Sequence, residues 1–113
     1  MTIETIQEQL IDDFSLMDEW EDKYAHIIEL GKKLAPFPEE QKSEINIIKG
    51  CQSKVWMISK FENGKVTYLA DSDAIIVKGL IAMLLSTYSG FTPEEILKNE
   101  PFFIGKIASR RKG

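Results

Sequence analysis

The dipeptide Asn63-Gly64 is the feature of this 113-residue sequence that most restricts its fold. Asn-Gly favours a two-residue hairpin turn, because a type I′ turn requires positive φ at both of its central residues. Apolar residues alternate with a period of two on both sides of it, which is typical of half-buried strands. The alternation predicts a strand over 55–61 and a return strand over 66–70. Ile45, Ile47 and Ile48 predict a third strand ahead of them.

Two segments with helical periodicity precede the predicted sheet. Thr2 is a suitable N-cap for a helix that extends to Met17, and a second helix is predicted from about Asp18 to Leu34. The stretch 36–38, Pro-Phe-Pro, ends helix formation, because proline lacks a donor N–H and restricts the residue before it.

The sequence returns to helical periodicity after the return strand. Ser72 or Asp71 is expected to cap a helix that is apolar on nearly all sides over 74–85, a pattern that indicates burial on more than one side. Gly90 suits the end of this helix, and Thr-Pro-Glu-Glu at 92–95 has the pattern of a capping box for a short further helix. The order of helices, sheet and helices predicts one α+β domain over 1–113, with a small antiparallel sheet packed against helices.

Composition and charge exclude several functions. The formal net charge of −4 and the sequence pI of about 5.0 give no nucleic-acid footprint. The most apolar stretch contains Lys78 and is too short to cross a bilayer, so no membrane partner is expected. One cysteine and no apolar N-terminal signal segment favour a cytoplasmic setting. With His26 as the only histidine, a structural zinc site lacks ligands, and neither a metal nor another cofactor is expected on this chain.

Cys51 is the only cysteine, and it lies in a polar connection ahead of the predicted strand. Gly50 permits a tight turn before it, and Gln52 continues the polar stretch. Lys49 and Lys54 supply positive charge near the thiol, which favours the thiolate. Free cysteines are more often inert apolar residues, but those normally lie inside a helix or strand pattern. We therefore expect a nucleophile on a loop, suited to sulfur transfer, which needs no general base.

Two separated motifs resemble those of the SufE family of sulfur-acceptor proteins. They are Gly50-Cys51-Gln52-Ser53-x-Val55-Trp56 and Asp71-Ser72-Asp73-Ala74-x-x-Val77-Lys78-Gly79-Leu80. The runs 20–24, 27–31 and 91–93 are also similar to this family. Two motifs in the right order are more specific than one short pattern, and the resemblance covers roughly residues 5 to 104.

The resemblance implies a fold similar to that of IscU-type scaffolds and a role in iron–sulfur cluster assembly. SufE-like proteins take the terminal sulfur of a persulfide from a cysteine desulfurase and pass it to a scaffold protein. Cys51 is then the sulfur acceptor, and the pyridoxal phosphate belongs to the desulfurase. The chain lacks the additional cysteines with which a scaffold holds a cluster. The family pattern continues with a further loop that carries an arginine and with a closing helix, and we expect this part to be missing here.

Other residues of the two motifs have smaller expected roles. Trp56 is either a wall of the thiol pocket or a core side chain. Asp71 and Asp73 either support the thiol loop or contact the desulfurase, unless they only cap the helix. Lys78 must direct its ammonium group to water or to a carboxylate, because it interrupts an apolar helix. Gly79 is expected to allow a close contact between the helix and the sheet.

Two other functions stay open at this point. A thiol peroxidase or redox sensor would also use Cys51, although it would lack a resolving cysteine. A non-catalytic module would bind the desulfurase by docking alone. For the carrier we expect a covalent persulfide on Cys51 rather than the activity of a stand-alone enzyme. We also expect two positions of the Gly50-Cys51-Gln52 loop, one sheltering the sulfur and one reaching into the desulfurase.

Overall fold

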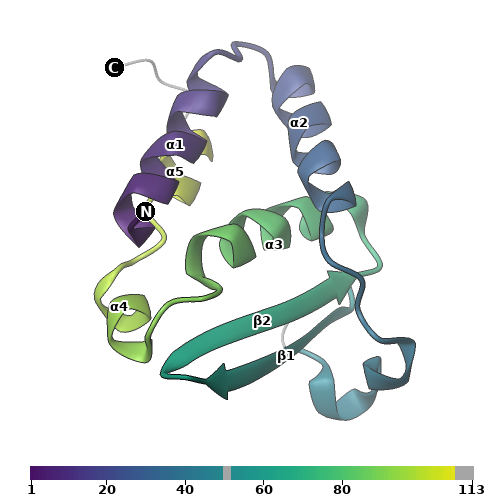
Figure 1. Cartoon of the computed structure of the whole chain (residues 1–113). Helices are drawn as coiled ribbons and strands as arrows, with labels where there is room; N and C mark the ends of the chain where they lie inside the picture. The colour runs from purple at the N-terminus through teal and green to yellow at the C-terminus, as the bar shows by residue number, and fades with distance from the viewer. Residues whose placement is uncertain (50–51, 109–113) are drawn as a thin grey trace.

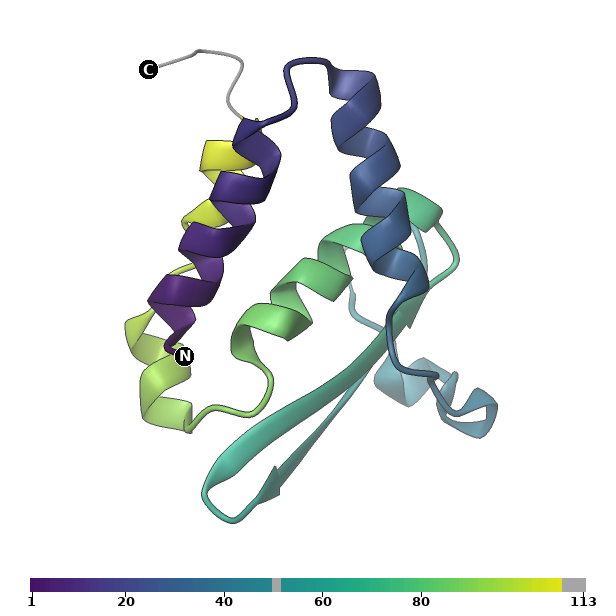
Figure 2. The same ribbon diagram turned by 45° about the horizontal axis from the view of Figure 1, so that its top comes forward.

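A computed structural model describes residues 1–49 and 52–108 of the chain, as helices packed on a small sheet (Figure 1). The elements are α1 (Ile3–Ser15), α2 (Trp20–Lys32), the 3-10 turns η1 (Glu39–Gln41) and η2 (Glu44–Asn46), β1 (Val55–Glu62), β2 (Lys65–Ser72), α3 (Ile75–Tyr88), α4 (Pro93–Lys98) and α5 (Phe103–Ala108). In the turned view α3 runs along the sheet, and one end of α2 packs against α3 (Figure 2). The predicted α+β class is confirmed.

The predicted hairpin is confirmed, and it makes up the sheet. β1 and β2 pair antiparallel in continuous register, from Val55 opposite Ser72 to Glu62 opposite Lys65. Asn63 and Gly64 have φ values of 52° and 76°, as the type I′ turn requires.

The outer edge of β2 is partly covered by the segment that follows α3. Val66 bridges Phe91 through backbone hydrogen bonds, one of which joins the Val66 N–H to the Phe91 carbonyl over 2.8 Å. The Tyr68 N–H donates to the hydroxyl of Ser89 at 3.0 Å. Gly90 has a φ of 92°, which fits the predicted helix end and turns the chain back toward β2.

The third strand predicted over 45–48 is wrong except for one bridge. Residues 44–46 form η2, and only Ile47 pairs with the sheet, opposite Trp56. The amide of Asn46 donates to the Gln41 carbonyl at 2.8 Å. Such a local side-chain bond competes with strand pairing, and the apolar alternation alone could not reveal it.

Two helix starts follow the predicted capping. Thr2 forms a capping box with Thr5, and Thr92 forms one with Glu95 ahead of α4, which has Pro93 in its first turn. These bonds satisfy N–H groups that the first turn of a helix leaves without a partner.

The predicted cap of the central helix is wrong. α3 begins at Ile75 after Ala74, and no side chain caps it. The Ser72 hydroxyl instead donates to the Lys54 carbonyl at 2.8 Å and accepts from the Ala74 N–H at 3.2 Å. The Asp71 carboxylate forms ion pairs with Lys42 and Lys78, so both residues predicted as caps have other partners.

The helices and the sheet enclose two apolar clusters. The first joins α1, α2, α3 and α5 and consists of Phe14, Ile27, Met83, Phe103 and Ile107. The second lies between the sheet and α3 and consists of Val55, Ala70 and Ile81. This packing keeps the start of β1 and the end of β2 fixed against α3.

Two glycines let α2 and α3 come into close contact. A Cβ atom on Gly79 would overlap the carbonyl oxygen of Ile27, and one on Gly31 would lie 2.9 Å from the Gly79 backbone nitrogen. The close contact expected for Gly79 therefore exists, but it is between helices and not between helix and sheet.

Candidate functional site

The candidate site is the connection that leads from η2 to β1. Cys51 and Gly50, the two central residues of the sequence prediction, lie outside the described residues. The structure describes both ends of this connection, namely residues 47–49 and 52–54. The Ile48 N–H donates to the Val55 carbonyl at 2.8 Å, so the two ends lie side by side. We call residues 48, 49, 54 and 55 the loop stem.

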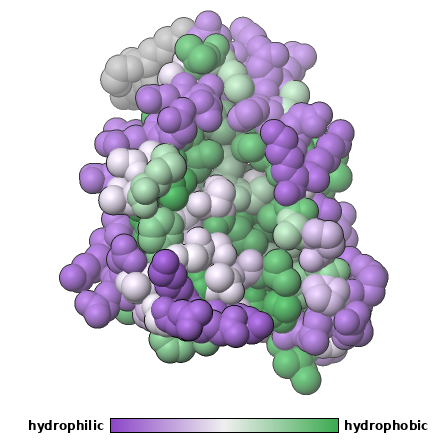
Figure 3. All heavy atoms as spheres, viewed as in Figure 1, coloured by the Kyte–Doolittle hydropathy of each residue, from purple (hydrophilic) through white to green (hydrophobic). Residues whose placement is uncertain are grey.

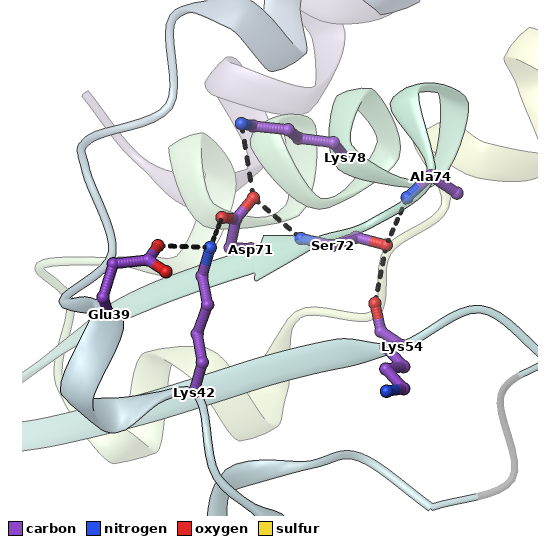
Figure 4. A network of polar contacts seen from close by, with 7 residues as sticks. All are labelled: Glu39, Lys42, Lys54, Asp71, Ser72, Ala74 and Lys78. Atoms are coloured by element: carbon purple, nitrogen blue, oxygen red, sulfur yellow. Dashed lines mark hydrogen bonds and ion pairs between the residues drawn. The ribbon is translucent and has the colours of Figure 1, made fainter.

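The second end of the stem is also bonded to the junction between β2 and α3. The Lys54 N–H donates to the Asp73 carboxylate at 3.0 Å, and the Asp73 N–H donates back to the Lys54 carbonyl at 3.2 Å. The same carbonyl accepts the Ser72 hydroxyl at 2.8 Å (Figure 4). Three hydrogen bonds thus fix Lys54 to Ser72, the last residue of β2, and to Asp73, the next residue.

A network of four charged side chains lies beside this junction, with Asp71 at its centre (Figure 4). The Asp71 carboxylate lies 3.0 Å from the Lys42 ammonium and 3.3 Å from that of Lys78, and it also accepts the Ser72 N–H at 2.8 Å. Lys42 also pairs with Glu39 at 2.8 Å. The Lys78 ammonium was expected to reach water or a carboxylate, and it pairs with the carboxylate of Asp71. Through Lys42, the network ties the η1 segment to the end of β2.

The protonation of Asp71 follows from this environment. Burial of its side chain, which is only 14% exposed, opposes ionisation. The hydrogen bonds from Lys42, Ser72 and Lys78 outweigh that effect and lower the pKa of Asp71 below its ordinary value. Hydrogen bonds to Glu39 and then Asp71 raise the pKa of Lys42. Asp71 is therefore ionised at neutral pH, and the ammonium groups of Lys42 and Lys78 largely cancel its charge.

Trp56 and Gln52 differ in their surroundings. Trp56 lies in β1 opposite Asp71 of β2 and is half-buried. The Lys42 ammonium lies 5.4 Å from the centroid of the Trp56 ring. It belongs to neither apolar cluster of the described chain, so the ring lies beside the charged network rather than in the core. Gln52 is exposed.

Sequence reasoning missed Lys42, Glu39 and the backbone of Lys54. Lys42 reaches Asp71 across a long stretch of chain, and no local pattern announces such a contact. Ser72 is predicted to cap α3, because a serine before a helix is usually its cap, but its hydroxyl donates to the Lys54 carbonyl instead.

Metal binding has no support in the described part of the chain. There, no three His, Cys, Asp or Glu side chains are grouped to hold an ion. His26 instead packs edge-on against Phe14, with 4.9 Å between ring centroids.

Two cavities lie away from the loop stem. One of about 380 Å³ lies among α1, α2, α3 and β2, where apolar residues show between the helices (Figure 3). The other, of about 440 Å³, lies between the end of α3 and α4. Residues of the stem or of the charged network line neither of them.

The first sequence motif covers the connection into β1, and the second begins at the junction between β2 and α3. Comparison with known proteins gives the chain a family. The model of the Fe-S metabolism associated domain, SufE, matches residues 8–111. The chain belongs to the SufE family. This family is associated with iron–sulfur metabolism.

Two relatives are themselves named as SufE-like. An uncharacterized SufE-like protein of Rhizobium etli is 44% identical over 101 residues, which cover 86% of this chain and 68% of the relative. One of Rhizobium meliloti is 42% identical over 108 residues, covering 91% of this chain and 77% of the relative.

A solved structure supports the fold. The solution structure of a hypothetical protein from Thermus thermophilus matches with a TM-score of 0.68 at 24% identity, over 88% of this SufE-family chain and 74% of that chain. None of the described helices is long and apolar enough to cross a membrane.

Proposed function

We propose that this SufE-family chain is a sulfur acceptor that takes persulfide sulfur from a cysteine desulfurase onto Cys51 and relays it to an iron–sulfur scaffold protein. The observation that best supports this is the loop stem. The only cysteine of the sequence lies in a short connection whose ends are bonded to each other and to Asp73. A carrier needs such an arrangement, because a reactive sulfur must be presented to two different partners in turn.

The transfer conserves atoms and electrons without an oxidant. The Cys51 thiolate attacks the outer sulfur of the donor persulfide and forms a new S–S bond, while the S–S bond of the donor breaks. The donor cysteine leaves as a thiolate, and the proton of the outer sulfur stays on that sulfur. The product is a persulfide on Cys51, and a scaffold takes its outer sulfur in the next step.

The pairing of Asp71 supports this chemistry electrostatically. An unpaired carboxylate near a thiol favours the protonated form and slows attack. Here Asp71 is held by Lys42 and Lys78, so that the charge of this carboxylate is compensated. Lys49 and Lys54 in the stem are exposed cations. Trp56 and Gln52 are the residues that we propose to border the thiol.

Intact-mass measurement tests the proposal. After incubation with L-cysteine and the cysteine desulfurase of the same organism, wild-type chain should gain the mass of one sulfur atom. A reductant should remove this sulfur, and Cys51→Ser should not gain it. If the mass of wild-type chain stays unchanged while the desulfurase turns over, the acceptor role is wrong. Stimulation that persists in Cys51→Ser would instead favour a docking module, and peroxide-dependent oxidation without sulfur uptake would favour a redox enzyme.

A further inference from the structure

The cavity of about 380 Å³ lies between the two apolar clusters of the fold. Met83 lines it and belongs to the first cluster, whereas Ala70 lines it and belongs to the second. These two residues are 2% and 1% exposed, so the cavity extends down to the core. We call this space the Lys33 cavity, after the one charged residue that lines it in the described chain.

The wall of the Lys33 cavity is mostly apolar. Leu10 of α1 and Leu30 and Leu34 at the end of α2 line it, together with Ala82 and Leu85 of α3. Three helices and β2 therefore contribute to one wall. An apolar cavity of this kind does not favour water, and it takes up apolar molecules that fit.

The serines of the wall already have backbone partners. The Ser86 hydroxyl donates to the Met83 carbonyl at 2.9 Å, and the Ser89 hydroxyl accepts the Tyr68 N–H at 3.0 Å. These bonds satisfy the polar atoms of α3 and β2 that would otherwise demand a polar ligand atom. This side of the cavity thus suits a hydrocarbon chain.

The charged end of the cavity is Lys33, directly after α2. Lys33 is exposed and forms no ion pair with any residue in 1–49 or 52–108. Glu29, one helical turn before it, pairs with Lys32 at 3.7 Å instead. The Lys33 ammonium can therefore pair with an anion at the mouth of an apolar space.

The second cavity provides a contrast of similar size. It measures about 440 Å³ and is also mostly apolar, but the one charged residue that lines it in the described chain is Glu100. A carboxylate is repelled there and attracted to Lys33. The two cavities therefore differ in the sign of the ligand charge that they favour.

We infer that the Lys33 cavity binds an unbranched aliphatic carboxylate of about ten carbon atoms, with its chain between the two clusters and its carboxylate at Lys33. A cavity of about 150 Å³ holds benzene, so by proportion the Lys33 cavity has room for about fifteen non-hydrogen atoms. Burial of the chain supplies most of the affinity, and the ion pair fixes its direction. This site shares no lining residue with the loop stem and is independent of the sulfur-acceptor role.

Calorimetric titration with three ligands of equal chain length tests the site. Decanoate is the probe, and decanol and decyltrimethylammonium are the neutral and cationic comparisons, each kept below its micelle concentration. We expect one decanoate per chain with a Kd of roughly 10–100 µM, and decanol and the cation at least about fivefold weaker. Saturating decanoate should also raise the melting temperature, because a ligand that binds only the folded chain stabilises it.

Two matched pairs of variants locate the ligand. Lys33→Gln should weaken decanoate binding roughly fivefold and leave decanol binding unchanged, whereas Lys32→Gln, which removes the neighbouring charge outside the cavity, should stay within about twofold of wild type. Ala82→Phe should fill the cavity and weaken all binding at least about tenfold. Ala25→Phe, on the exposed side of α2, should not.

Circular dichroism establishes that each variant is folded, and the lysine pair decides alone if Ala82→Phe is not. No decanoate binding at millimolar concentration, equal weakening by Lys32→Gln and Lys33→Gln, or decanol that binds as tightly as decanoate overturns the inference. Cys51→Ser should bind decanoate like wild type, so sulfur uptake and ligand binding can fail separately.

Discussion

Replacing Gly79 with alanine tests how closely α2 and α3 pack. Helix propensity alone predicts that Gly79→Ala stabilises the protein by about 1 kcal/mol, since glycine is the poorer helix former. The structure predicts the opposite. The new Cβ atom would overlap the Ile27 carbonyl oxygen and lie 2.7 Å from the Ile27 carbonyl carbon. Backbone atoms cannot move away by changing a rotamer, so α2 itself must shift.

The magnitude follows from what α2 contributes to the core. Ile27 belongs to the same apolar cluster as Met83 of α3, and separating the helices loosens that cluster. Overpacking of this kind costs about 3 kcal/mol. After the gain of about 1 kcal/mol from propensity, the free energy of unfolding should fall by about 2 kcal/mol. For a domain of this size the melting temperature should decrease by roughly 8 °C.

Urea denaturation followed by circular dichroism measures the effect, and Gly105→Ala is the matched control. Gly105 is also inside a helix, α5, but a Cβ atom there would have no heavy atom within 4 Å. We expect Gly105→Ala to leave stability unchanged or to raise it by up to about 1 kcal/mol. A Gly79→Ala protein as stable as wild type would refute the close helix contact.

Three other predictions concern the junction beside the stem. Asp73→Ala should speed amide exchange at Lys54 roughly fivefold, while Asp73→Asn, which keeps an acceptor oxygen, should change it less. Equal exchange rates in the two variants would contradict the hydrogen bond from the Lys54 N–H to the Asp73 side chain. Asp71→Asn should cost about 1–3 kcal/mol at neutral pH in urea unfolding, because Lys42 and Lys78 lose their anion. Since folding lowers the pKa of Asp71, this stabilisation is present above the ordinary aspartate pKa of about 4 and disappears as pH falls through the lowered value. The stability difference between wild type and Asp71→Asn should therefore shrink on acidification, and a pH-independent difference would show that the charge is not responsible. Lys42→Met, which keeps most of the side-chain length but removes the charge, should change the intensity or the emission maximum of Trp56 fluorescence, because the Lys42 ammonium lies over that ring. An emission spectrum identical to that of wild type would contradict this contact.

Local signals in the sequence were sufficient for most of the fold. Asn63-Gly64 determined the hairpin because its turn geometry is encoded in two adjacent residues. Thr2 and Thr92 likewise start helices through bonds to residues three positions away. The failures were non-local or competitive. The isoleucines over 45–48 alternate like a strand, but side-chain bonding of Asn46 favours a turn there.

The candidate site shows the same limit. The two motifs identified the residues of the stem and the junction, because family resemblance carries information that periodicity does not. They could not show that the Asp73 carboxylate binds the Lys54 N–H rather than capping the start of α3, nor that Lys42 completes the Asp71 network. Both contacts join residues far apart in the chain, and only the packed helices and sheet bring them together.

The covered edge of β2 has a consequence for how these molecules meet in crowded solution. An exposed strand edge offers unpaired N–H and C=O groups to which a strand of another chain can hydrogen-bond, and a flat sheet with two free edges can grow by such additions without end. Here Phe91 and Ser89 occupy part of one margin. Open-ended fibre growth needs two free margins, so this cover works against it.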